Sequence, residues 1–222
     1  ILLASAPFVT SPSLFPYLPY DTIKDFDSVA TIAKSRYALE LNPAVPANTL
    51  QEFIALAKAK PGQLNYASTG VGSASHLAGE LFNIAADIKM QHIPYKGAGP
   101  ALTDLIGGQV QLSFQVQIAA IPHIKGGKLK AIAVTGETRS SALPQVPTFA
   151  EAGLPGYEMM PGWFGIVAPA GTTKEIVDKM SSAIAVILVT PDTREYLAKQ
   201  GMEPFISTPG QVTALIKADI TK

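Results

Sequence analysis

Short runs of β-type residues alternate with capped amphipathic helices along most of this 222-residue chain. Residues 37–41, 64–67 and 129–134 are short apolar runs that predict strands, whereas residues 73–86 carry apolar side chains at the spacing of a helix face. This alternation is typical of α/β folds, in which helices cover sheets of largely parallel strands. The sequence therefore predicts an α/β protein.

Local signals mark four helix starts. Residues 49–52 form a capping box that predicts a helix to residue 59, and residues 172–175 form a second box. Two Thr-Pro pairs, at 190–191 and 208–209, each place a cap before proline at the first helical position. Each of these four signals predicts a helix.

The segment 135–162 is rich in proline, glycine and charged residues. This composition predicts a long surface connection with one short helix near residues 149–152. The segment is the expected crossing between two domains.

The charges of the chain exclude several classes of partner. Seventeen basic and 17 acidic residues give a net charge of zero, so no basic field is expected for nucleic acid or an anionic membrane. The absence of cysteine excludes disulfides and thiolate metal sites, and no apolar run approaches the roughly 18 residues of a membrane span. A charged ligand must therefore be recognised by local groups.

The stretch from Tyr66 to Gly79 predicts an anion site. A short strand breaks into a turn rich in glycine and hydroxyl groups and continues as an apolar helix, whose first N–H groups have no internal partner. Gly70 and Gly72 let the backbone come close to a ligand. The hydroxyl groups of this turn belong to Ser68, Thr69, Ser73 and Ser75. The alternative is an ordinary connection in which Ser73 only caps the helix, and the residues leave both interpretations open.

Known phosphate-binding loops differ from this turn. A Walker loop requires lysine, and the dinucleotide fingerprint requires glycine or alanine where Ser75 stands. Nucleotide binding is therefore disfavoured, and a small carboxylate is the simplest anion.

A second glycine-rich turn, at residues 94–100, precedes a helix expected over 101–106. The helix start after Gly97 and Gly99 is expected to point N–H groups at the same ligand. Ser73, Thr69 and Tyr95 are the expected side-chain contacts. Lys96 could pair with an acidic ligand, although a solvated surface position is favoured for it.

Several segments together resemble one family, the tripartite tricarboxylate transporter receptors, which are Bug or TctC-type periplasmic solute-binding proteins. The matching segments are 18–21 with 24–26, 68–73 with 76–79, 94–97, 105–110, 123–135, 139–140, 143–153, 163–165 and 168–172. They run in family order over nearly the whole chain.

The resemblance implies a two-lobe Venus-flytrap fold in which each lobe is a mostly parallel sheet flanked by helices. Residues 1–34 and 137–222 are expected to form one lobe, and residues 35–136 the other. The implied protein is not an enzyme and uses no cofactor or metal. It captures a mono-, di- or tricarboxylate in a periplasmic cleft between the lobes and delivers it to the permease of the transporter, without inserting into the membrane itself.

The family also has an earlier strand and glycine-rich turn, preceded by an export signal, and a final stretch after Lys222. The apolar run Ile1–Ser5 begins without a polar lead-in, which agrees with an expected truncation at both ends.

The residues and the resemblance together predict one ligand site. Ser5 and Ala6, after the first strand, are expected to face the glycine turns from the other lobe. Gln115 stands where related proteins commonly carry an acid, which favours a ligand with an acceptor or second carboxylate over an ammonium ligand. The full set of candidates is Ser5, Ala6, Ser68, Thr69, Gly70, Gly72, Ser73, His76, Tyr95, Lys96, Gly97, Gly99 and Gln115.

Two other functions compete with this interpretation. His76 lies one turn after Ser73, a spacing that suggests an α/β hydrolase-like enzyme, but no acidic orienting group and no Gly-x-Ser-x-Gly elbow accompany the pair. The third possibility is a truncated fragment without a competent site. His92 and His123 lack the spacing and partners of a metal site, and Trp163 is expected to pack in the core or between the lobes.

Overall fold

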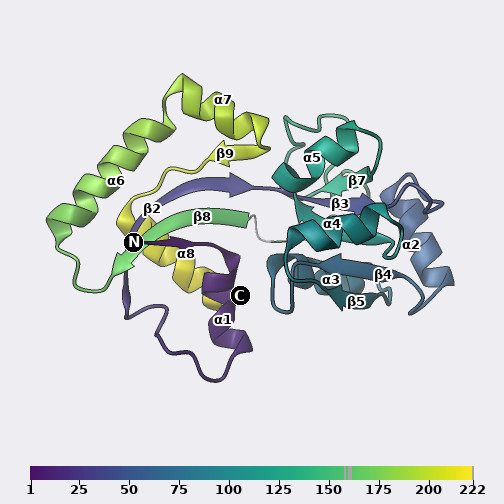
Figure 1. Ribbon diagram of the computed structural model, residues 1–222, viewed down its shortest axis with the longest axis horizontal. Helices are drawn as coiled ribbons and strands as arrows, with labels where there is room; N and C mark the ends of the chain where they lie inside the picture. The colour runs from purple at the N-terminus through teal and green to yellow at the C-terminus, as the bar shows by residue number, and fades with distance from the viewer. Residues whose placement is uncertain (158, 160–161, 222) are drawn as a thin grey trace. The chain divides into compact units, whose positions relative to one another are not determined.

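The computed structural model describes residues 1–157, 159 and 162–221, and the chain divides into two compact units (Figure 1). Unit 1 comprises Ile1–Ser35 and Gly162–Lys222, and unit 2 comprises Arg36–Pro161. The division differs from the expected one because the segment after residue 136 stays with unit 2. Thr148 forms a bridge to Val134, and Phe149 and Tyr157 are buried in the core of that unit.

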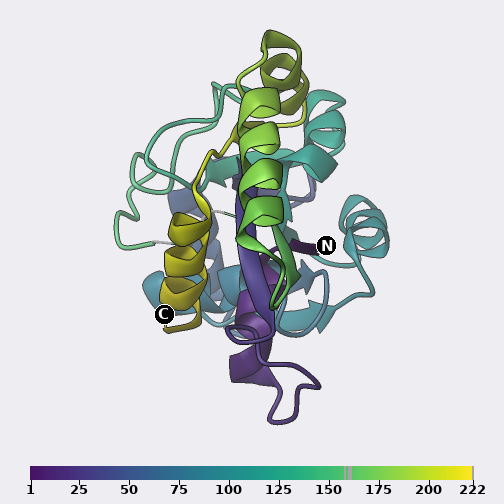
Figure 2. The same cartoon turned by 90° about the vertical axis from the view of Figure 1, so that its left-hand side faces the viewer.

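Unit 1 is built on a four-stranded sheet with the order β1-β8-β2-β9. Its strands are β1 (Leu2–Ala4), β2 (Phe26–Ser35), β8 (Gly162–Pro169) and β9 (Met202–Pro204), and its helices are α1 (Ala6–Leu14), α6 (Lys174–Leu188), α7 (Pro191–Lys199) and α8 (Pro209–Thr221). Helices α6 and α8 both pack along β2 (Figure 2).

Unit 2 is built on a five-stranded sheet with the order β5-β4-β6-β3-β7. Its strands are β3 (Tyr37–Leu41), β4 (Asn65–Ser68), β5 (Gln91–Pro94), β6 (Leu112–Val116) and β7 (Lys130–Val134), and its helices are α2 (Leu50–Ala59), α3 (Ala74–Ala85), α4 (Ala98–Ile106) and α5 (Gln117–Lys125). Strands β5, β4 and β6 are parallel, whereas β3 runs antiparallel to β6 and β7.

The α/β class with two sheets is confirmed, but the expected strand direction is wrong for unit 1. Every pair in its sheet is antiparallel. The chain leaves unit 1 along β2 and comes back to it along β8, so these neighbouring strands run in opposite directions. Parallel pairing needs a crossover between consecutive strands, and such crossovers occur in unit 2, where helices follow β4, β5 and β6.

Helix starts with a complete local signal are confirmed. The Thr49 hydroxyl accepts a hydrogen bond from the Glu52 amide at 3.1 Å, Thr190 caps α7, and Thr208 accepts from the Gln211 amide at 3.3 Å. The expected box at 172–175 does not form, because the Thr172 hydroxyl donates to the carbonyl of Pro169 and α6 begins later, at Lys174.

Other element boundaries differ from the expected ones. Helix α4 begins three residues before its expected start, and residues 149–152 form a turn instead of a helix. The sequence interpretation omitted α1, β2 and β9. Helix α1 contains Pro12 in its interior, which weakens its helical signal. None of the described helices combines the length and the apolar character needed to cross a bilayer.

The largest core cluster lies in unit 2 between the sheet and helices α2 and α3. Phe82 stands at its centre, with ring centroids at 5.7–6.1 Å from four neighbouring aromatic rings: Phe53, Phe114, Phe149 and Tyr157. A separate apolar cluster with Ala67, Leu102 and Leu105 packs α4 onto the sheet. Packing on both faces holds the strand ends, and the turns that follow them, in place.

Helix α3 approaches β4 most closely at Gly79. A Cβ atom added at Gly79 would lie 2.2 Å from Cε2 of Tyr66, whose ring is fully buried and whose hydroxyl donates to Glu80 at 2.5 Å. Because this ring cannot swing away, we expect Gly79→Ala to lower the free energy of unfolding by about 1–3 kcal/mol. Denaturant unfolding measures the change.

Gly99 in α4 is the matched control, because a Cβ atom added there would meet nothing within 4 Å. We expect Gly99→Ala to cause no loss of stability and to gain up to about 1 kcal/mol from reduced freedom of the unfolded chain. Equal losses from the two substitutions would contradict the packing explanation.

Candidate functional site

Three helices of unit 2 begin at one edge of its sheet. Because β5, β4 and β6 are parallel neighbours, their carboxyl ends lie at the same edge, and α4, α3 and α5 follow these ends in turn. The first amides of each helix have no intrahelical partner and carry the positive end of the helix dipole. This edge therefore gathers three positive helix ends, an arrangement that suits an anion.

The glycine turn between β4 and α3 depends on backbone that only glycine adopts easily. Gly70 has φ = 139° and Gly72 has φ = 76°. The Tyr95 amide donates to the Ser68 carbonyl at 3.0 Å, and a Cβ atom at Gly70 would lie 3.5 Å from the Tyr95 carbonyl oxygen. The two glycine-rich turns predicted from the sequence are thus in contact.

The hydroxyl groups of the turn bond mainly to the turn itself. The Ser73 hydroxyl donates to the Gly70 carbonyl at 2.7 Å and accepts from the His76 amide at 3.3 Å, so Ser73 is the N-cap of α3. Ser75 Oγ is buried, accepts from the Thr69 amide at 2.9 Å and lies 3.0 Å from Ser73 Oγ. These side chains preorganise the turn, and because the His76 amide already donates to Ser73, the amides that precede His76 at the start of α3 are the primary donors to a ligand.

The second turn presents α4 in a similar way. Gly97 is the N-cap at φ = 112° without a side-chain cap, and Cβ atoms added at Gly97 or Gly99 would meet nothing within 4 Å. Lys96 is exposed. The Tyr95 hydroxyl donates to Asp104 at 2.7 Å, and burial together with this carboxylate raises the pKa of Tyr95 to about 12. Tyr95 thus has a structural partner already.

The expected Ser73–His76 pair does not form a hydrogen bond between side chains. His76 Nδ1 instead accepts from the Gly72 amide at 3.0 Å. The serine and histidine that do meet are Ser68 and His92, with 2.5 Å between Oγ and Nε2, but Ser68 is fully buried and cannot meet a substrate. The geometry therefore gives no support to a hydrolase.

From the sequence, His92 was considered only as a metal ligand and Arg36 was not named, and both lie at this edge. Burial is the main cause that lowers the pKa of His92 from its usual 6.5, and the neighbouring His76 lowers it further. The Arg36 carbonyl accepts from the Gln117 amide at the start of α5, and the Arg36 guanidinium donates to the carbonyl of Thr138.

Gln115, Ser5 and Ala6, which were also expected to contact the ligand, lie outside the two glycine turns. Gln115 is buried, and its amide donates to Ser113 Oγ at 2.9 Å. Ser5 and Ala6 belong to unit 1, where Ser5 is the N-cap of α1 and Ala6 its first residue. Ligand contacts by these three residues stay predictions.

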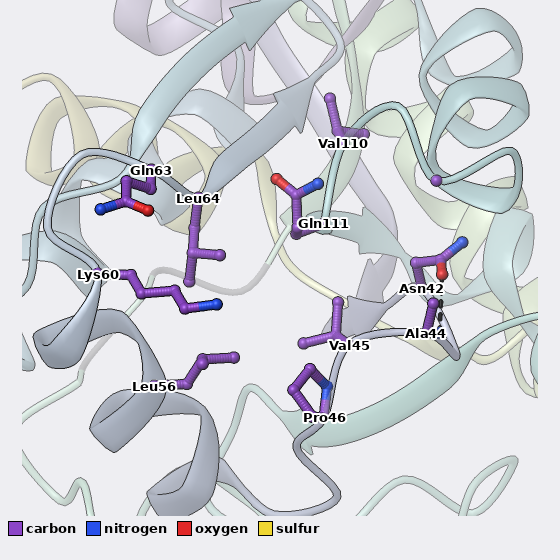
Figure 3. A pocket seen from close by; sticks show the side chains of 11 residues that line it. Asn42, Ala44, Val45, Pro46, Leu56, Lys60, Gln63, Leu64, Val110 and Gln111 are labelled. Atoms are coloured by element: carbon purple, nitrogen blue, oxygen red, sulfur yellow. Dashed lines mark hydrogen bonds between the residues drawn. The ribbon is translucent and has the colours of Figure 1, made fainter.

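A separate pocket of about 320 Å³ opens at the other end of β4 (Figure 3). Val45, Leu56, Leu64 and Val110 supply apolar walls, and Lys60 reaches across it between Leu56 and Leu64. Leu64 precedes β4, whereas the glycine turn follows it. None of the candidate ligand residues lines this pocket, so it is distinct from the edge with the three helix starts.

The protein BugT of Bordetella pertussis is 36% identical to this chain over 219 residues, which are 99% of this chain and 67% of BugT. The chain spans 65% and 61% of the lengths of two further relatives, from Pseudomonas sp. strain P51 and Cupriavidus necator. It therefore spans about two thirds of the length of the relatives that it matches.

Two solved structures are similar to the chain throughout. Rpa4515 of R. palustris, solved with adipate, has a TM-score of 0.94 and 31% identity, and the match covers 99% of this chain and 73% of that one. MatC of Rhodopseudomonas palustris, with bound malate, has a TM-score of 0.84 and 31% identity over 98% of this chain and 73% of that one.

A sequence model described as "Tripartite tricarboxylate transporter family receptor" matches residues 1–222. The chain therefore belongs to the family of tripartite tricarboxylate transporter receptors.

Proposed function

We propose that this chain is the ligand-binding part of a periplasmic receptor that captures a small dicarboxylate. One observation carries the proposal: three helix N-termini gather at the carboxyl edge of β5, β4 and β6, next to two glycine-rich turns. Backbone amides and helix dipoles bind a carboxylate without a dedicated lysine or arginine. Adipate and malate in the structures of Rpa4515 and MatC support a dicarboxylate as the ligand class.

The proposed role is capture without chemical conversion, followed by delivery to the permease of a tripartite tricarboxylate transporter. Family membership supports this role and the periplasmic location. The proposal assigns the first ligand contacts to the amides at the start of α3 and α4, because the hydroxyl groups of Ser73 and Ser75 are engaged within the turn.

Isothermal titration calorimetry with adipate, malate, citrate and benzoate tests the proposal, with adipamide as the uncharged control. We expect saturable binding of at least one dicarboxylate, no binding of adipamide and an unchanged ligand after prolonged incubation. A cooperatively folded chain that binds none of the carboxylates would contradict the proposal.

A pair of variants locates the site. Gly97→Val places a branched side chain in the open space before α4, at a positive φ, and we expect it to weaken dicarboxylate binding at least about tenfold, or about 1.4 kcal/mol. Lys60→Gln removes the cation from the separate pocket and is expected to leave binding unchanged. The reverse result would move the site to that pocket.

A further inference from the structure

Two histidines stack beside the glycine turn of unit 2. The ring centroid of His76, on α3, lies 3.9 Å from the ring centroid of His92, on β5, and the two ring planes differ by 19°. The Tyr66 ring of β4 also stacks on His92, with ring centroids 5.0 Å apart and 25° between the planes. His92 therefore contacts two rings next to the turn.

Both histidines hold the turn through hydrogen bonds. His76 Nδ1 accepts from the Gly72 amide at 3.0 Å, which requires an unprotonated Nδ1 and therefore a neutral ring with its proton on Nε2. His92 Nε2 lies 2.5 Å from Ser68 Oγ, and this oxygen in turn accepts from the Gly70 amide at 3.2 Å. His76 thus holds Gly72 directly. Gly70 is instead held by Ser68, whose hydroxyl also donates to the Gly70 carbonyl at 3.1 Å and contacts His92.

We propose that His76 is a positioning residue of the carboxylate site, and that protonation of the His76–His92 pair releases the glycine turn and lowers the affinity for carboxylates. The inference rests on the proposed function and adds a pH-dependent control to the same site.

Protonation turns His76 Nδ1 from a hydrogen-bond acceptor into a donor. A protonated His76 carries N–H on both nitrogens, so its Nδ1–H would face the Gly72 N–H and the bond that holds the turn would be lost. Two protonated rings 3.9 Å apart would also repel each other.

Burial and the neighbouring histidine oppose protonation of His92, and Glu80 partly offsets them. From β5 the facing group is His92, from β4 it is Tyr66, and on α3 itself it is Glu80, whose carboxylate accepts from the Tyr66 hydroxyl. Burial first, and His76 second, lower the pKa of His92, while Glu80 raises it by a smaller amount. The folded turn therefore favours a neutral His92 ring.

Three forms of the chain separate positioning from packing: wild type, His76→Asn and His76→Gln. The asparagine oxygen lies near the place of Nδ1 and does not titrate, whereas the glutamine amide reaches the place of Nε2 and removes the hydrogen bond from the Gly72 amide to Nδ1. At about pH 7.5, we expect wild type and His76→Asn to bind adipate within about threefold of each other and His76→Gln to bind about tenfold more weakly.

Lowering the pH to about 5.5 is expected to weaken adipate binding by wild type relative to His76→Asn, by less than the about tenfold that an unshifted histidine would give, because burial lowers the pKa of His92. Protonation of adipate itself affects wild type and His76→Asn equally, so it cancels in the ratio of their dissociation constants at each pH. An unchanged ratio, or a wild type that gains affinity relative to His76→Asn, would overturn the proposal, as would His76→Gln binding as tightly as wild type.

Nuclear magnetic resonance of the ligand-free chain tests the positioning role separately from carboxylate binding. In ¹⁵N-labelled wild type we expect His76 Nδ1 to show the shift of an unprotonated, hydrogen-bonded nitrogen, and the Gly72 amide to move with the histidine titration. The Gly72 amide of His76→Asn should not follow that titration. A chain that binds no carboxylate but shows these signals would contradict only the proposed function, whereas a protonated Nδ1 at neutral pH would overturn the role of His76.

Discussion

Replacing Phe82 with alanine is expected to lower the free energy of unfolding by about 3–5 kcal/mol, because the change leaves a cavity in the centre of the unit 2 core. The Phe82 side chain is fully buried and contacts aromatic rings from α2, β6 and the segment after β7. Those rings are tied to separate backbone segments, so they cannot collapse together into the space. Denaturant unfolding followed by circular dichroism measures the loss.

Leu81 provides the control for Phe82, since it precedes Phe82 on the same helix but is 43% exposed. We expect Leu81→Ala to change the free energy of unfolding by no more than about 0.5 kcal/mol. Similar losses from both substitutions would mean that helix propensity, and not the aromatic core, decides the effect.

A gain of stability of about 1–3 kcal/mol near pH 7.5 is expected when Glu40 is replaced by methionine. Glu40 lies in the middle of β3, paired with Ser113 of β6 and Ala131 of β7, and it is fully buried. Neither carboxyl oxygen has a hydrogen-bond partner among the described residues. Methionine has a similar length and removes the unsatisfied polar group.

The stability of the wild type is also expected to depend on pH through Glu40. Burial raises the pKa of Glu40 well above its usual 4.5, so the folded chain keeps a proton that the unfolded chain releases above that pH. Stability from this group is therefore complete below about pH 4.5 and declines as the pH rises toward the raised pKa, by up to about 1.4 kcal/mol per pH unit.

Unfolding curves at several pH values, recorded for Glu40→Met and for Glu137→Met, check both expectations. Glu137 is an exposed glutamate of the same unit, so its replacement should change neither the stability nor its pH dependence by more than about 0.5 kcal/mol. A wild type whose stability increases relative to Glu40→Met as the pH rises above 4.5 would contradict the assignment.

Local signals determined those parts of the fold whose partners lie within a few residues. Thr49 and Glu52 bond across three residues, and so do Ser73 and His76, so the starts of α2 and α3 could be predicted without knowledge of the rest of the chain. The glycine turn was expected to allow close backbone approach at Gly70 and Gly72, and both residues have positive φ. The sequence by itself therefore determined the α/β class, the glycine turns and the start of α3, on which the candidate site depends.

The tertiary structure alone decided strand direction and the roles of the polar side chains. Residue types did not show that unit 1 would be antiparallel, because its main pair joins β2 to β8 across the whole of unit 2 in the sequence. Ser68 meets His92 from 24 residues away, and Gln51 of α2 donates to the carbonyl of Ala152 from 101 residues away. Such contacts depend on where the packed sheet places separate strands, and the spacing of neighbouring residues carries no information about them.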